Sequence, residues 1–135
     1  MFEVPKSLLE NPSKALFHRS GNKLLRALAA AVGLEAKTFD VRSCLGGPGV
    51  MGEVILHTSH FYIQLFIDGT KPRLLYRTCK GQKDYTGGRN DYVWLGSLVD
   101  DSRRQFVVIL KRMHEQGRIA AIHEVPQSKH KVLVA

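Results

Sequence analysis

Two apolar stretches on either side of Asp68-Gly69 constrain the fold of this chain more than any other feature. Phe61 to Ile67 is apolar on both of its faces, as expected of a central strand, and Arg73 to Cys79 alternates between the two faces. Asp-Gly is a frequent pair in the tight turns of β-hairpins. The sequence therefore predicts an antiparallel hairpin near the centre of the domain.

Two earlier stretches extend this hairpin into a sheet. Thr38 to Ser43 and Glu53 to Thr58 both alternate, and a glycine-rich connection from Gly46 to Gly52 separates them. Four strands in sequence order with short connections predict an antiparallel meander.

A helix is expected before the sheet. Asn11-Pro12 fits a helix N-cap followed by proline at the first helical position, and Gly33 offers a stop after Val32. One continuous apolar stripe follows spacings of four, three, four and three residues, through Phe17, Gly21, Leu24, Leu28 and Ala31. Because glycine costs about 1 kcal/mol inside a helix, a break at Ser20-Gly21 is an alternative.

A second helix is expected after the sheet. Asp100 and Asp101 favour a helix start, Gly117 fits its end, and helical spacing links Phe106, Ile109, Leu110 and Met113. Residues 118–124 and 131–134 fit either a last pair of short strands around Pro126 or a tail. We expect one α+β domain over residues 1–135, an antiparallel four-stranded meander with an N-terminal and a C-terminal helix packed on one face, and with 125–135 as a candidate loosely held tail.

The net charge of +8 on 135 residues favours polyanionic or acidic partners. The N-terminus has no signal-peptide pattern, and no apolar run approaches the length that spans a bilayer. We therefore expect a cytoplasmic protein without a membrane partner. Cys44 and Cys79 are expected to be reduced thiols, with a single disulfide as the alternative.

Cations and aromatic rings are interleaved from Lys71 to Tyr92. Such interleaving suits a ligand with phosphates and flat bases. The predicted phosphate contacts are Arg73, Arg77, Lys80, Lys83 and Arg89, and Tyr85 or Tyr92 would stack on a base. In the first helix Arg19, Lys23 and Arg26 share a face, with no acid between Asn11 and Leu34. The alternatives are an edge strand protected by its charges and a solvated helix face.

The glycine-rich connection carries a weaker pattern. Gly47 to Val54 matches GxGxxGxV and resembles the glycine-rich loop of protein kinases, but the other kinase motifs are missing and the chain is too short, so a mobile hairpin connection is expected. A loop that enters a partner's cleft is the alternative. A Rossmann interpretation fails because a strand, not a helix, follows the glycines.

Histidine, cysteine and tryptophan residues give no firm site. His57 and His60 lack an identifiable third ligand, and Cys79 lacks a base nearby in sequence. Trp94 is expected in the core. No catalytic residue, metal or cofactor is predicted.

Three functions remain open. The first is a small non-catalytic nucleic-acid-binding accessory protein, for DNA or RNA. The second is a protein-interaction module, an adaptor or inhibitor that docks its 80–92 or 46–52 loop on an acidic protein surface. The third is a small hydrolase or nuclease built on His57, His60 or His123. The first depends on the two groups of cations meeting on one side of the molecule, and their separation favours the second.

Overall fold

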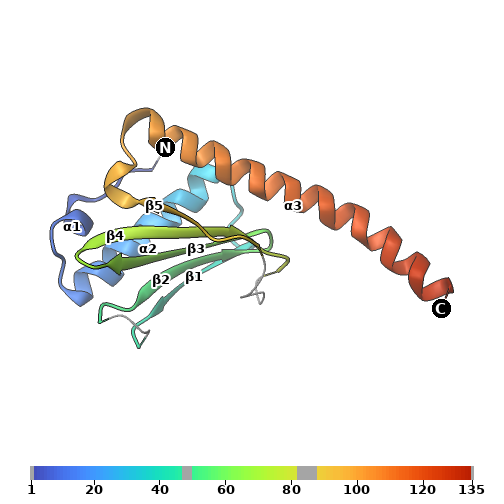
Figure 1. The fold of residues 1–135 in the computed structure, drawn as a ribbon, viewed down its shortest axis with the longest axis horizontal. Coiled ribbons are helices and arrows are strands. Elements are labelled where there is room, and N and C mark those ends of the chain that lie inside the picture. Colours follow the sequence, from blue (N-terminus) through green and yellow to red (C-terminus); the bar gives the residue numbers. More distant parts are fainter. Residues whose placement is uncertain (1, 47–49, 82–87, 135) are drawn as a thin grey trace.

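The computed structural model describes residues 2–46, 50–81 and 88–134, with side chains described as far as residue 122 (Figure 1). The elements follow one another as α1 (Lys6–Leu9), α2 (Lys14–Val32), β1 (Phe39–Cys44), β2 (Glu53–Thr58), β3 (Phe61–Asp68), β4 (Lys71–Thr78), β5 (Asp91–Trp94), a 3-10 turn η1 (Leu95–Ser97) and α3 (Asp100–Val134). The predicted α+β class is confirmed, with helices at both ends of the chain.

The strands form one antiparallel sheet in the order β1-β2-β3-β4-β5. The predicted hairpin is present, with Asp68 opposite Lys71 and Phe61 opposite Thr78. The predicted number of strands was wrong, because β5 adds a fifth strand at the edge. At four residues it is at the short limit of what alternation can identify.

One face of the sheet carries the core. Residues that are paired across the strands on this face include Val54 with Leu65, Leu56 with Ile63, and Leu65 with Leu74. All five side chains are at most 1% exposed. Helix α2 covers this face, drawn behind the sheet in Figure 1, and α3 adds Phe106, whose ring lies 5.1 Å from that of Tyr76.

Gly21 allows α2 to lie close to the sheet. A Cβ atom at this position would come within 2.8 Å of Leu65 Cδ2 and 3.0 Å of Val54 Cγ2, closer than normal van der Waals contact. Helix α2 is continuous through Gly21, so the alternative of a break at Ser20-Gly21 is wrong. The predicted apolar stripe is buried at Phe17, Leu24 and Leu28.

The predicted C-terminal end of α2 is confirmed, whereas the predicted N-terminal end is wrong. Gly33 ends the helix in the left-handed conformation, with φ of 90°, and its N–H bonds the carbonyls of Ala29 and Ala30. The start was predicted two residues too early. Ser13, not Asn11, is the N-cap, and its hydroxyl accepts a hydrogen bond from the Leu16 N–H at 3.2 Å.

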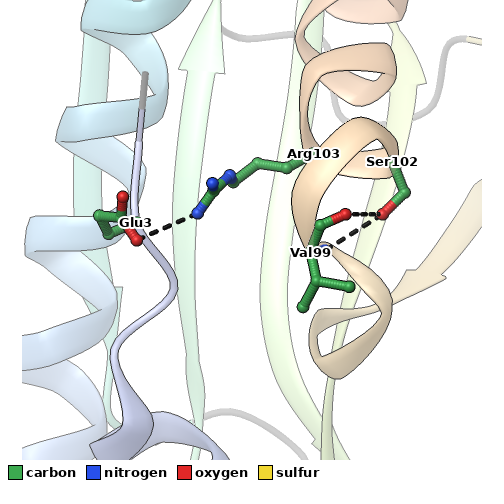
Figure 2. Close-up of polar contacts among 4 residues, drawn as sticks. All are labelled: Glu3, Val99, Ser102 and Arg103. Carbon is green, nitrogen blue, oxygen red and sulfur yellow. Dashed lines mark hydrogen bonds and ion pairs between the residues drawn. The ribbon is translucent and has the colours of Figure 1, made fainter.

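The start of α3 is fixed by two polar contacts, drawn in Figure 2. The Ser102 hydroxyl accepts a hydrogen bond from the Val99 N–H at 3.1 Å, and Arg103 pairs with Glu3 at 3.0 Å. The second contact ties the N-terminal segment to α3. The described residues include no helix that is both long enough and apolar enough to cross a membrane.

The predicted end of the last helix was wrong. The backbone of α3 continues through Gly117 to Val134, in place of the pair of short strands considered for 118–124 and 131–134. Gly117 lets α3 pack closely against His60, because a Cβ atom at this position would lie 2.6 Å from His60 Cβ and 2.8 Å from its Cγ. A sequence pattern cannot distinguish this use of glycine from a helix stop.

We predict that Gly117→Ala destabilises the protein. Overpacking costs about 1–3 kcal/mol and alanine regains about 1 kcal/mol of helix propensity, so the free energy of unfolding should fall by about 1 kcal/mol. Urea denaturation followed by circular dichroism measures this change.

Gln116→Ala is the matched control, because Gln116 is the exposed neighbour in the same helix. Its effect should stay within about 0.5 kcal/mol of zero. A Gly117→Ala variant as stable as this control would contradict the close contact with His60.

Candidate functional site: the distal face of the sheet

The face of the sheet turned away from α2 and α3, here the distal face, gathers aromatic, cationic and amide side chains. Strand alternation places them there, since neighbours of the core residues point to the other side. The set comprises Arg42, Ile55, His57, Tyr62, Gln64, Phe66, Arg73, Leu75, Arg77, Tyr92 and Trp94.

Arg73 is the centre of one cluster on this face. Its guanidinium carbon lies 4.3 Å from the centroid of the Tyr92 ring and 4.8 Å from that of Trp94, and its Nη1 bonds Asp68 at 2.7 Å. The Phe66 ring meets Tyr92 edge to face at 6.4 Å. Cation–π contacts hold both exposed rings against the guanidinium, so Arg73 links β5 to the body of the sheet.

A second cluster surrounds Tyr62. Arg77 lies 4.6 Å above the Tyr62 ring, and the Tyr62 hydroxyl donates to Gln64 Oε1 at 3.0 Å. Gln64 in turn donates to Glu53 at 2.7 Å. Burial, together with the charge of Glu53, raises the pKa of Tyr62 to about 12. Tyr62 is therefore neutral at physiological pH and acts as a hydrogen-bond donor.

A groove of about 620 Å³ lies at the end of β5. It is lined by Leu9, Lys71, Pro72, Trp94, Gly96 and Ser97. Leu9 and Trp94 are each 41% exposed, which is high for large apolar side chains. The groove thus joins an exposed apolar pair to the cation Lys71, which forms no ion pair with a described residue.

The predicted nucleic-acid site is split by the fold. Arg73, Arg77 and Tyr92 lie on the distal face, whereas Arg19, Lys23 and Arg26 lie on the exposed side of α2, which packs on the opposite face. The expected single surface is therefore not formed. The reason is that Gly21 and the apolar stripe turn the other side of α2 toward the sheet.

The other residues predicted to bind nucleic acid lie apart from the distal face or outside the described residues. Lys80 follows β4, and Arg89 precedes β5, where it pairs with Asp91 at 3.4 Å. Lys83 and Tyr85 lie outside the described residues, as do the rest of 82–87 in the 80–92 loop and residues 47–49 of the GxGxxGxV match. Of that connection, Met51 accepts a hydrogen bond from His18 Nε2 at 2.7 Å.

Sequence reasoning missed two exposed apolar side chains, Trp94 on the distal face and Leu9 in the adjoining groove. Trp94 was expected in the core, and this was wrong because its strand position places it beside Arg73 on the distal face. Leu9 was not considered, because α1 is a single short turn without periodicity. The available signal was the alternation of Tyr92, Val93 and Trp94, in which only Val93 packs against the core.

The histidines do not form a common centre. His57 is fully buried on the distal face, where its Nδ1 accepts from Arg42 at 3.3 Å. His60 packs against α3, where its ring centroid lies 5.2 Å from that of His114. The side chain of His123 is not described. Within the described residues, no three His, Cys, Asp or Glu side chains are placed to hold a metal ion.

Cys79 lies beside His60: its N–H donates to the His60 carbonyl at 3.0 Å, and both residues line a pocket of about 300 Å³. Cys79 is buried, and its Sγ donates to the Thr58 carbonyl at 3.3 Å, as suits a packed thiol. Cys44 is half-buried on β1 and is not disulfide-bonded to Cys79.

Comparisons with protein-family models, curated proteins and solved structures found no match to this chain. The site must therefore be interpreted from its own geometry.

We predict that acid weakens the fold through His60. Burial lowers the pKa of His60 below its ordinary 6.5, and the charges of His114 and Arg118 lower it further. The unfolded chain thus binds a proton at a higher pH than the folded chain does. The stability contributed by neutral His60 is present above about pH 6.5 and is lost as the pH falls through the folded pKa.

Urea denaturation between about pH 7.5 and pH 5 measures this loss, and His60→Gln should reduce the pH dependence. An NMR titration of the His60 ring gives the folded pKa directly. A folded pKa at or above 6.5 would contradict the buried contact with α3.

Proposed function

We propose that this protein is a non-catalytic interaction module that docks a segment of a partner protein on the distal face. The observation that carries the proposal is the Arg73 cluster, in which one guanidinium holds Tyr92 and Trp94 at 45% and 41% exposure. Tyrosine, tryptophan and arginine are the residues that most often dominate binding at protein interfaces. Rings fixed in this way lose little conformational freedom when a partner binds.

The charges of this face favour a protein over a nucleic acid. On this face Arg42 pairs with Asp40 and Arg73 with Asp68, and Glu53 adds a third carboxylate, which accepts a hydrogen bond from Gln64. A phosphate backbone would have to compete with these carboxylates, which also add repulsion. The distal face is therefore close to neutral, although the protein as a whole carries a net charge of +8.

The groove beside Trp94 indicates the chemistry of the docked segment. Its exposed apolar walls, Leu9 and Trp94, suit one aliphatic or aromatic side chain of the partner. Lys71 at the rim suits an acidic residue next to that side chain. We therefore propose a partner segment that carries an apolar anchor beside an aspartate or glutamate.

A hydrolase built on the histidines has less support. His57 and His60 lie on different sides of the sheet, and the ring contacts of each are explained by packing against Tyr62 and His114. Nucleic-acid binding remains a proposal for the opposite side of the molecule.

The test is a phage-displayed peptide library selected on the nuclease-treated protein. We expect the selected peptides to share an apolar residue beside an acidic one. Because Trp94 is the sole tryptophan of the chain, binding of a synthetic peptide should shift its fluorescence emission to shorter wavelength. Trp94→Ala should weaken binding of a labelled peptide by about 2 kcal/mol, or roughly 30-fold.

Val108→Ala is the control, because Val108 is 46% exposed but lies on α3. It should leave the affinity within about twofold. Selected peptides that bind Trp94→Ala as tightly as Val108→Ala would refute docking at this face. An oligo-dT strand that shifts the Trp94 emission where no peptide does would instead assign the face to nucleic acid.

A further inference from the structure

The exposed side of α2 carries a stripe of three cations, Arg19, Lys23 and Arg26, here the α2 stripe. Spacings of four and three residues place them on one face of the helix, and all three side chains are exposed. The stripe extends over about 10 Å, at 1.5 Å per residue. It lies away from Gly21, which faces the sheet.

The stripe lacks the local carboxylates that neutralise the distal face. No acidic residue occurs in α2, and no ion pair within the described part of the chain involves these three side chains. Arg26 donates only to the neutral amide of Asn22, at 2.8 Å. Like charges at this spacing repel one another, so a bound anion would relieve an unfavourable arrangement.

We infer that the α2 stripe binds the phosphate backbone of double-stranded nucleic acid. A duplex carries one negative charge per roughly 1.7 Å of its axis, so a stripe of about 10 Å faces several phosphates at once. The exposed residues beside the cations include Ala15, Ala27 and Ala30, which are small enough to let a backbone approach the helix. Binding of this kind carries no sequence preference.

Two other anionic partners fit the stripe less well. A helix that binds a membrane surface buries its apolar face in the lipid, but Phe17, Leu24 and Leu28 of α2 are at most 2% exposed in the core. An acidic protein would be expected to meet aromatic anchors, and the exposed neighbours of the stripe are alanines. The phosphate backbone requires only the charges.

The test is fluorescence anisotropy with labelled duplex DNA and duplex RNA of the same length, over a range of salt concentrations. The variant Arg19→Ala/Lys23→Ala/Arg26→Ala should bind at least about tenfold more weakly than wild type at low salt. Its slope of log affinity against log salt should be shallower by about 3. Both effects should be the same for unrelated duplex sequences.

The control is Lys37→Ala/Lys111→Ala/Arg112→Ala, which removes the same number of charges from exposed positions outside α2. If this control loses as much affinity and slope as the stripe variant, binding depends on net charge alone and the stripe is refuted. Binding of the wild type to vesicles with anionic lipid but not to either duplex would also refute it. Trp94→Ala should leave duplex binding unchanged, so this inference and the docking proposal fail separately.

Discussion

The close packing of α2 on the sheet at Gly21 determines where every functional side chain lies. A side chain at this position would meet Leu65 and Val54, so only glycine lets the helix settle this deeply. Once α2 covers that face, its cations point outward on one side of the molecule. The arginines of β4 then lie on the other side, because strand alternation places them opposite the core.

This separation gives the two sides different chemistry. On the distal face Asp68 neutralises the charge of Arg73, and the Arg73 guanidinium holds the rings of Tyr92 and Trp94 in place. On α2 the side chains of Arg19, Lys23 and Arg26 are exposed and form no ion pair with a described residue. The first arrangement suits a protein segment and the second a phosphate backbone. A protein with both surfaces would bring a partner protein to a nucleic acid.

Local patterns in the sequence predicted much of the fold. The Asp68-Gly69 hairpin, the stripe of α2 and its stop at Gly33 are encoded by neighbouring residues, and all are present. Two of the failures depended on distant contacts. In the sequence Gly117 is typical of a helix stop, but in the structure it is a close contact with His60. Trp94 is typical of a core residue, but in the structure it lies beside Arg73.

The candidate site was harder to predict for the same reason. Sequence showed two groups of cations but contained no information on whether they share a side, since that depends on how α2 packs. An NMR titration of the ¹⁵N-labelled protein with duplex DNA tests the division most directly. We expect the amide signals of Arg19, Lys23 and Arg26 to shift and the signal of the Trp94 indole N–H to stay unchanged. Shifts at Trp94, Tyr92 and Arg73 with α2 unchanged would contradict this division.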